Sequence, residues 1–538
     1  MSGLFEKRAD GSTRRMERNK KENKARRKRR TITVSVTAVM LVLFAASLVV
    51  NSNYIRRTLP AISIGGHSFT AVEFDYFYNN AYQEYANWVQ EQFGEYEDYV
   101  ASLLPSSEIP LSNQVYDADT GETWADFFTE RAIANMSELL KFYNAAEAAG
   151  FQIPPEGVAQ IEDAITSIMD EARSYVALYP NQYTSPDGYL HALFGSAINE
   201  RGLRNVMMFV QRAVTYSESM RTSFTFTPGE LEEYYLENRD LLDIFSFRVL
   251  FVEPVYLDRE DYASDEDYEE ATDNELAVAN LKAQRMADEI GSEEDFIAVA
   301  REYDADVYGD PLSTRMDQMG EELDPDFAEW LTGEEPLKFG DMKIIDYPYG
   351  SALMFFIARN DNSYFTTAMR QILLLRDELS PDSFPAGVED PEYIDLLADI
   401  DSQAGERAKE VLGIFTSGEA SEERFAELVA IYSDDNIEGG YYDRIAKFMY
   451  QSQTTYTLRV VDEIEQWLFD RERAVGDFEL IRTEAYGYHI VYFMGFGERM
   501  RDIIAEDRMG SSTFLAWGES LPAAGEVTRH WAFMFTMA

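Results

Sequence analysis

The residue types that most often carry catalysis are sparse in this chain. It has 538 residues, with no Cys and 4 His. The absence of Cys excludes disulfides and thiol chemistry. The sequence has no HExxH motif, no Gly-rich phosphate loop and no Cys/His cluster, and its acidic stretch 260–275 lacks the glycine and the closing order of a calcium loop. We therefore expect no metal and no cofactor, and a solvated insertion at 260–275.

The C-terminal half contains a pattern of aromatic, glycine and acidic residues that occurs twice. Its anchors are Tyr303, Trp330, Gly340-Asp341 and Tyr349-Gly350 in the first copy, and Tyr432, Trp467, Gly476-Asp477 and Tyr486-Gly487 in the second. The offset is 129 positions at the tyrosines (432 − 303) and 137 at the tryptophans (467 − 330). A nearly constant offset of this length indicates duplicated domains, with one insertion of about eight residues between the anchors.

Each copy predicts the same order of elements around these anchors. Apolar residues at 296, 299, 300 and 303 have the spacing of one helical face. The segment 486–493 is rich in β-branched and aromatic residues, which predicts a buried strand, and further strand candidates at 245–252 and 370–375 precede the two copies. A strand, helices and a closing strand pair predict a small α+β domain in each copy.

The second copy resembles the parvulin family of peptidyl-prolyl isomerases. The matching segments, in order along the chain, are Gln371-Ile-Leu-Leu, Phe425 to Asp435, Gly439-Gly440, Gly476-Asp477 and Gly487-Tyr-His-Ile-Val. The match covers residues 364–500, and residues 243–360 more loosely. It implies that the chain speeds cis/trans exchange of X–Pro bonds. Their rotational barrier of about 18–20 kcal/mol can be lowered without a nucleophile, metal or cofactor.

The resemblance also implies a set of site residues. Parvulin-type sites use two inward histidines beside a Cys or Asp. The three matching positions hold Gln371, Asp435 and His489, which are the catalytic candidates. Gln371 replaces the first histidine, and its amide can donate and accept hydrogen bonds but cannot titrate. His489 could instead be a histidine whose hydrogen bonds are satisfied within the sheet, and that alternative stays open.

The family surrounds the proline ring with Met and Phe side chains. Phe448, Met449 and Phe469 are therefore the substrate-binding candidates in the second copy. In the first copy, the two histidine positions read Arg248 and Ala352. The resemblance thus implies a degenerate first domain, with a structural or binding use, and a weakly active second domain.

The charge pattern at the N-terminus predicts a membrane anchor. Residues 1–30 contain thirteen Lys or Arg against four Asp or Glu, a net charge of +9, and residues 31–50 contain no charged side chain. Twenty uncharged, largely apolar residues are enough for one membrane span. Because positive residues stay on the cytoplasmic side, the chain after residue 51 should face outward. A run of this length favours an uncleaved signal anchor over a cleaved signal peptide.

The rest of the chain is strongly acidic. The whole chain has a net charge of −50, so removing the +9 of the tail leaves −59 on the remaining part (−50 − 9). Such a charge keeps a protein soluble and disfavours nucleic-acid binding, and it would attract basic, newly secreted polypeptides. Surface solvation alone is the simpler explanation of the charge.

Residues 55–240 have the apolar spacing of long helices, at 72–93, 123–149, 155–179 and 199–223. This helical part opens with Ile64-Gly65-Gly66, Phe69-Thr70 and Glu73-Phe74 and is followed by isomerase-like repeats. In this it resembles the SurA/PrsA-like foldases, and the resemblance implies an apolar surface that binds unfolded clients. Aromatic residues and methionines of these helices would supply that surface, although most should lie in the helical core. They are Phe74, Tyr76, Phe77, Tyr78, Tyr82, Tyr85, Trp88, Met207, Met208 and Phe209.

These observations predict a membrane-anchored, extracytoplasmic α+β foldase of the cell membrane, with unfolded or newly secreted polypeptides as partners. The expected parts are a basic cytoplasmic tail (1–30), a transmembrane helix (31–50), a helical chaperone-like domain (55–240), two tandem parvulin-like domains (243–360 and 364–500) and a C-terminal tail (501–538) of unassigned role. One alternative is a holdase chaperone without isomerase activity. The other is a surface scaffold or adhesion protein.

Overall fold

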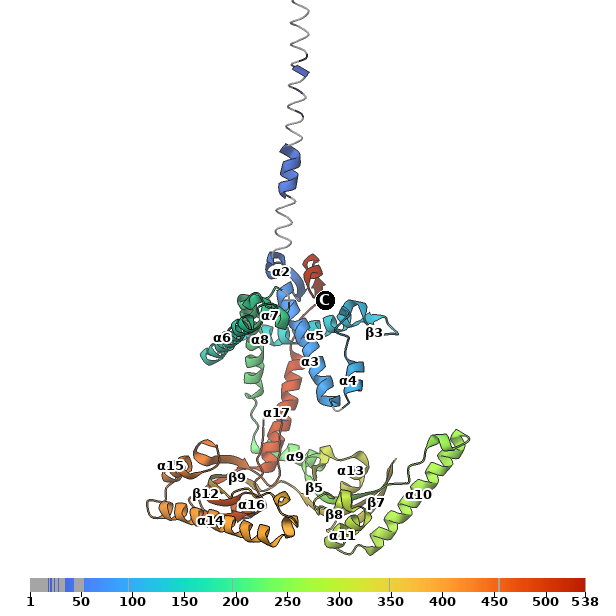
Figure 1. Cartoon of the computed structure of the whole chain (residues 1–538), viewed down its shortest axis with the longest axis vertical. Coiled ribbons are helices and arrows are strands. Elements are labelled where there is room, and N and C mark those ends of the chain that lie inside the picture. The colour runs from blue at the N-terminus through green and yellow to red at the C-terminus, as the bar shows by residue number, and fades with distance from the viewer. Residues whose placement is uncertain are drawn as a thin grey trace, which may run out of the picture. The chain divides into compact units, whose positions relative to one another are not determined.

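The computed structural model describes residues 18, 20, 21, 24, 28, 34–42, 53–94, 96–195, 197–347, 349–452 and 455–537. These residues form a mixed α+β chain with two compact units (Figure 1). The first unit contains the described residues up to Ser223 together with those from Phe514 onward, and the second runs from Phe224 to Thr513. The predicted α+β class is confirmed.

Among the described residues, no helix combines the length and the apolar composition needed to cross a membrane. Of the span predicted at 31–50, only residues 34–42 are described, and they are helical. The remainder of that span and most of the basic tail lie outside the described residues. The membrane anchor therefore stays a prediction.

Four long helices build the first unit. They are α3 (Ala71–Phe93), α5 (Trp124–Ala148), α6 (Pro155–Leu178) and α8 (Glu200–Arg221). Thr70 caps α3 and Thr123 caps α5, each in a capping box with the acidic residue three positions later. The four helices predicted from apolar spacing are confirmed to within one or two residues at each end.

Two short sheets accompany these helices. β1 (Pro60–Ile64) lies between β2 (His67–Thr70) and β13 (Val527–Arg529), and β3 (Val115–Asp117) pairs with β4 (Glu122–Thr123). The C-terminal tail thus completes a sheet that begins near residue 60, a role that its sequence did not indicate. The other elements of this unit are α2 (Tyr54–Thr58), α4 (Glu97–Leu103), α7 (Pro186–Phe194) and single 3-10 turns at 111–113 and 531–535.

The aromatic residues proposed as a client surface lie mainly in the core of the first unit, as expected. Phe74, Phe77 and Tyr78 are buried beside Phe128 and Met136, and most of the others are half-buried around them. Trp88 is the exception, because 48% of its surface is exposed.

Two four-stranded antiparallel sheets with the same strand order form the centre of the second unit. The first sheet, in the order β6-β5-β8-β7, contains β5 (Ile244–Val252), β6 (Arg315–Met319), β7 (Met342–Tyr347) and β8 (Gly350–Asn360). The second, in the order β10-β9-β12-β11, contains β9 (Phe365–Leu375), β10 (Tyr441–Ile445), β11 (Phe478–Thr483) and β12 (Gly487–Arg499). We call the two sheets with their helices the first repeat and the second repeat.

Helices cover both faces of each sheet (Figure 1). In the second repeat, α14 (Pro391–Thr416) and α15 (Glu422–Tyr432) pack on the face that contains Ile372 and Ile490. Successive side chains of a strand point to opposite faces. The other face therefore contains Met369, Val491 and Phe493, and is covered by α16 (Asp462–Leu468). We call this second surface the site face.

The first repeat repeats this arrangement. α10 (Asp265–Glu289) and α11 (Glu293–Tyr303) cover one face, and α13 (Pro325–Leu331) covers the other. A short helix, α12 (Ala305–Tyr308), follows α11. Most of the acidic stretch at 260–275 is exposed, and from Asp265 onward it forms the start of α10, where acidic residues in the first turn favour the positive end of the helix dipole.

A glycine turn occupies the same place in both repeats. Gly340 has a φ of +90° and Gly476 a φ of +95°, values that favour glycine. The Gly340 N–H donates to the Phe356 carbonyl over 3.0 Å, and the Gly476 N–H donates to the Phe493 carbonyl over the same 3.0 Å. The Gly-Asp anchors of the duplicated pattern thus make identical backbone hydrogen bonds at the start of each closing hairpin.

Candidate functional site

The three catalytic candidates of the second repeat form one hydrogen-bonded chain. Gln371 lies on β9 and His489 on β12, both on the site face. The Gln371 amide nitrogen donates to Asp435 Oδ2 over 2.9 Å, and Gln371 Oε1 lies 3.0 Å from His489 Nδ1. Asp435 follows α15, where the Ser433 hydroxyl accepts from the Asp435 N–H over 3.2 Å. The structure brings these predicted residues together, and their catalytic role stays a prediction.

Two further side chains extend this chain, and neither was predicted. The Tyr442 hydroxyl on β10 donates to Asp435 Oδ2 and accepts from the Gln371 amide over 3.1 Å. At the other end, Thr483 Oγ1 lies 3.0 Å from His489 Nε2. Both residues lie on strands beside β9 or β12, so only the strand pairing could have identified them. We call these five residues the polar chain.

The donor and acceptor order of the polar chain assigns the histidine tautomer. A carboxylate only accepts, so the Gln371 NH2 group must face Asp435 and its carbonyl must face His489. His489 Nδ1 then carries the proton that it donates to Gln371. Nε2 is left as an acceptor for the Thr483 hydroxyl. Every polar group in the line has a partner of the right kind.

Burial sets the charge states along the polar chain. It lowers the pKa of His489 to about 4, against the opposing charges of Glu463 and Asp435, so the imidazole is neutral near pH 7. Burial alone would raise the pKa of Asp435, but hydrogen bonds from Tyr442 and Gln371 outweigh it and bring this pKa below its ordinary value. Burial and the bond to Asp435 raise the pKa of Tyr442 to about 12. The polar chain therefore has an ionised end at Asp435 and a neutral end at His489.

Of the three candidates for a proline pocket, Phe469 shares a packed cluster with Tyr442 of the polar chain. Phe448 packs in a cluster with Tyr235 and Ile244, and Met449 is 70% exposed. Phe469 joins the cluster of the site face that includes Met369 and Val491, and Val491 is paired with Gln371. Of the three candidates, only Phe469 belongs to the cluster of the site face.

The strand register of the first repeat corrects the match between Arg248 and Gln371 that the sequence suggested. Gly350 and Gly487 begin the equivalent strands β8 and β12, so Ala352 corresponds to His489 and Met354 to Val491. Val249 pairs with Met354, as Gln371 pairs with Val491. The counterpart of Gln371 is therefore Val249, and not Arg248.

Arg248 instead matches Arg370 on the opposite face of its sheet. Arg248 forms an ion pair with Glu293 at the start of α11, over 2.8 Å, and Arg370 forms one with Glu422 at the start of α15, over the same 2.8 Å. The first repeat thus has apolar residues, Val249 and Ala352, where the second has Gln371 and His489.

A separate pocket lies in the first unit, between β2, α3, α5, α6 and α8. It has a volume of about 410 Å³, and its walls include Phe69, Phe77 and Phe209. The ring of Phe209 lies 4.8 Å from that of Tyr143 and 5.6 Å from that of His67. Burial lowers the pKa of His67, against the charges of Glu73 and Glu147. A pocket of this size with aromatic rings in its walls can hold a large apolar side chain.

Within the part of the chain that the structure describes, no group of His, Asp and Glu side chains is arranged to hold a metal ion. No residue set with cofactor chemistry was predicted either.

No protein-family model and no curated protein matches this sequence. Among solved structures, the chain is similar to the crystal structure of PrsA from Bacillus subtilis, with 12% sequence identity and a TM-score of 0.15. The similarity covers 46% of this chain and 78% of that one. A TM-score this low transfers no function, so the residues themselves must support any proposal.

Proposed function

We propose that this chain is a membrane-anchored, extracytoplasmic foldase of the parvulin type, whose second repeat speeds cis/trans exchange of X–Pro bonds in newly secreted proteins. The observation that carries the proposal is the polar chain, in which Gln371 connects Asp435 to His489.

The first repeat supplies the internal comparison. It has the same strand order, and Val249 and Ala352 at the equivalent positions are 2% and 0% exposed. The fold is therefore built with apolar residues at these places. Burying polar groups costs free energy even when they are paired, and leaving one unpaired costs about 1–3 kcal/mol. A fully paired polar chain in only one of two matching sheets supports a functional role for it.

The half-buried end of the polar chain is where a substrate can reach it. Gln371 and His489 are 7% and 4% exposed, whereas Asp435 and Tyr442 are half-buried. Twisting an X–Pro bond removes amide resonance, which lowers the negative charge on the carbonyl oxygen and makes the proline nitrogen basic. A fixed carboxylate disfavours the planar, charge-separated form, and a hydroxyl can donate to the nitrogen once it turns away from the carboxylate to which it otherwise donates. We assign these roles to Asp435 and Tyr442, with Gln371 and His489 as positioning residues.

The full chain in detergent micelles tests this proposal against a peptide with one X–Pro bond, with the exchange rate measured by NMR. Asp435→Asn keeps the shape of the side chain but removes its charge, and should reduce the acceleration by about tenfold. Asp306→Asn is the matched control, because Asp306 follows Tyr303 as Asp435 follows Tyr432, and it should change nothing. An unaccelerated exchange with the wild-type chain would remove the isomerase assignment.

A holdase without isomerase activity is the second candidate. The burial of Gln371 and His489 favours it, because a substrate cannot touch them directly. The ring-lined pocket of the first unit gives such a protein a place for an apolar client side chain. If the chain suppresses aggregation of an unfolded protein while X–Pro exchange stays at the uncatalysed rate, the holdase is the better description.

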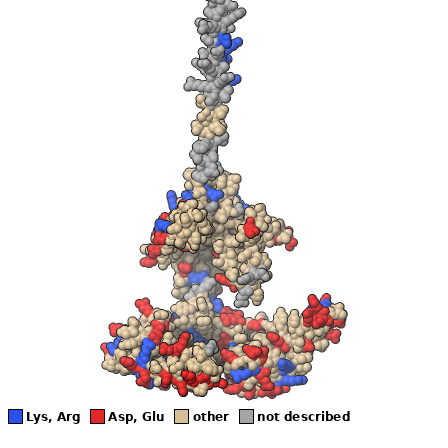
Figure 2. All heavy atoms as spheres, viewed as in Figure 1, with Lys and Arg blue, Asp and Glu red and all other residues tan. Residues whose placement is uncertain are grey.

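The location and partners are part of the same proposal. The +9 tail and the uncharged stretch at 31–50 support a single span with the N-terminus in the cytoplasm. Asp and Glu side chains are spread over the visible surface of the second unit (Figure 2), which suits basic, unfolded clients. Protease added outside intact cells should digest the chain beyond residue 51 and leave the basic tail. Protection of the C-terminal half would overturn this topology.

A further inference from the structure

A segment of the second repeat covers the site face and also contacts the first repeat. It runs from Ala446 to Leu468, of which all but residues 453 and 454 are described, and it includes α16. We call it the cover segment. Its residues Ile464 and Trp467 pack on Val491 and Phe493 of the site face. The position of this segment therefore determines what can approach the polar chain.

Apolar packing joins the cover segment to the first repeat. Ala446 and Tyr450 of the cover segment share a buried cluster with Ile244 and Met319 of the first repeat. The same cluster includes residues of α9 (Pro228–Leu242) and of α17 (Met500–Ser520), both of which flank the repeats in sequence. Phe448 is half-buried against the same cluster.

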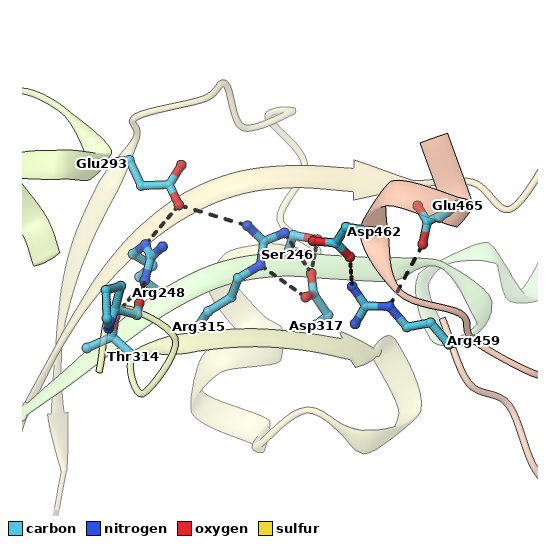
Figure 3. A network of polar contacts seen from close by, with 10 residues as sticks. Ser246, Arg248, Glu293, Thr314, Arg315, Asp317, Arg459, Asp462 and Glu465 are labelled. Carbon is cyan, nitrogen blue, oxygen red and sulfur yellow. Dashed lines mark hydrogen bonds and ion pairs between the residues drawn. The ribbon is translucent and has the colours of Figure 1, made fainter. Parts of the chain in front are cut away.

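An arginine–aspartate pair of the first repeat faces an arginine–aspartate pair of the cover segment across the boundary between the two repeats (Figure 3). On β6, Arg315 and Asp317 are 3.1 Å apart, and in the cover segment Arg459 and Asp462 are 3.3 Å apart. Each arginine has a second partner in its own repeat, Glu293 for Arg315 and Glu465 for Arg459, both at 3.9 Å.

The charges of the two pairs are complementary. A hydrogen bond with Asp317 raises the pKa of Arg315, and the charge of Asp462 adds to this rise. Burial alone would raise the pKa of Asp317, but hydrogen bonds with Arg315 and Ser246, together with the charge of Arg459, bring it below its ordinary value. Arg315 thus faces the negative charge of Asp462, and Asp317 faces the positive charge of Arg459, across the boundary between the repeats.

The charged contact lies at the start of α16. This helix begins at Asp462 without a side-chain cap, so its first turn depends on its neighbours. The next residue, Glu463, accepts from the Glu484 N–H over 3.2 Å, and its charge acts on His489. A shift of the helix start would therefore move a charge that the polar chain senses.

We propose that the first repeat is a fixed support for the cover segment, and that Arg315 and Asp317 are positioning residues for the site of the second repeat. The inference rests on the proposed function as far as the site is an isomerase site. It gives the repeat without a polar chain a role in the activity of its neighbour, through charge and packing and not through substrate contact.

The test is a double-mutant cycle on the full chain, with Asp317→Asn and Arg459→Gln. Hydrogen exchange of the α16 amides, measured by mass spectrometry at low salt, should become about threefold to tenfold faster in each single variant. The double variant should exchange no faster than either one, because both remove the same charge attraction between Asp317 and Arg459. Asp317→Glu, which keeps the charge, should retain slow exchange, and 1 M salt should reduce the difference between variants.

The matched control is the pair Arg259→Gln and Asp265→Asn, which removes an ion pair of the first repeat that involves no residue of the cover segment. It should leave α16 exchange unchanged. The isomerase kcat/KM of Asp317→Asn should fall by the same factor as its α16 exchange rises. The proposal that the first repeat supports the cover segment would be overturned by unchanged α16 exchange in both single variants. It would also be overturned if the effects of the two substitutions on α16 exchange were additive in the double variant.

The two proposals fail in different ways. If Asp435→Asn lowers isomerase activity while Asp317→Asn changes neither activity nor exchange, only the support by the first repeat is wrong. If the wild-type chain has no isomerase activity but the exchange cycle is non-additive, the support stands and the isomerase assignment is wrong.

Discussion

Gln371 and His489 are diagonal neighbours across strands β9 and β12, and do not face each other directly. Gln371 is paired with Val491, and His489 with Leu373, yet Gln371 Oε1 lies 3.0 Å from His489 Nδ1. Diagonal neighbours across a sheet are farther apart than direct pairs, so only a long side chain can connect them. The length of glutamine is therefore as important here as its amide.

Replacing Gln371 tests this connection. Gln371→His restores a ring that can donate to Asp435 and accept from His489, and we expect X–Pro exchange to become faster, by up to about tenfold. Gln371→Asn keeps the amide but is one methylene shorter, so it should lose the contact with His489 and slow the exchange. NMR exchange rates of an X–Pro peptide measure both variants. Equal rates for all three chains would show that the position does not contribute.

The low pKa of His489 predicts a pH dependence of stability. The pKa is about 4 in the folded chain, below the ordinary value of 6.5. The stabilising contribution of neutral His489 is complete above pH 6.5 and is lost as the pH falls from 6.5 to 4, because the unfolded chain binds the proton first. The loss should approach about 3 kcal/mol.

Urea unfolding of the wild-type chain and of His489→Gln, at pH 7 and pH 4.5, measures this difference. The variant should lose less stability on acidification, because glutamine does not titrate. His67, whose pKa is also lowered, remains in both chains and cancels in the comparison. An equal loss in both chains would contradict the buried, neutral imidazole.

Val249, the apolar counterpart of Gln371 in the first repeat, predicts that a glutamine is tolerated in the second sheet but destabilises the first. Val249→Gln would place an amide among Ala352, Met354 and Phe327, without the carboxylate or imidazole that pairs Gln371. An unsatisfied buried amide should destabilise the chain by about 1–3 kcal/mol. Val249→Leu is the control for size. Thermal unfolding measures both, and a Gln variant as stable as the Leu variant would contradict the difference between the two sheets.

Two glycines of the second repeat predict a ranking of stability effects. Gly476 and Gly487 both have positive φ, at +95° and +125°. A Cβ on Gly476 would meet the Tyr492 hydroxyl at 3.4 Å, whereas a Cβ on Gly487 would lie 2.8 Å from the Leu374 carbonyl oxygen. Gly476→Ala should therefore destabilise by about 1–3 kcal/mol through backbone strain alone, and Gly487→Ala by more. Urea unfolding gives the order, and a reversed order would show that backbone contact is not the dominant effect.

Local sequence patterns were sufficient for the parts of the fold that depend on near neighbours. The four long helices of the first unit were predicted from apolar spacing, and in the structure Thr70 and Thr123 cap two of them. The Gly-Asp anchors of both copies make the same turn, since Gly340 and Gly476 share a positive φ and the same backbone hydrogen bond. Gln371, Asp435 and His489 also meet as the ordered motifs implied.

The sequence was a poor guide where the position of a side chain depends on strand register or on packing between the repeats. The strand at 245–252 is apolar on both faces, so alternation does not fix its register, and Arg248 was aligned where Val249 belongs. Tyr442 and Thr483 were missed because their partners come from neighbouring strands. Phe448 also packs against residues of the first repeat, a contact that no local pattern shows.

The pairing of β13 with β1 has a consequence for the order in which the chain can mature during synthesis. Ser63 and His530, which are hydrogen-bonded over 2.7 Å, are 467 positions apart. The strands of both repeats pair only within the intervening unit, so those sheets can close while the ribosome is still adding residues. β1 emerges early but keeps one unpaired edge until Val527–Arg529 have been made. Synthesis from the N-terminus therefore leaves the first unit to be completed last.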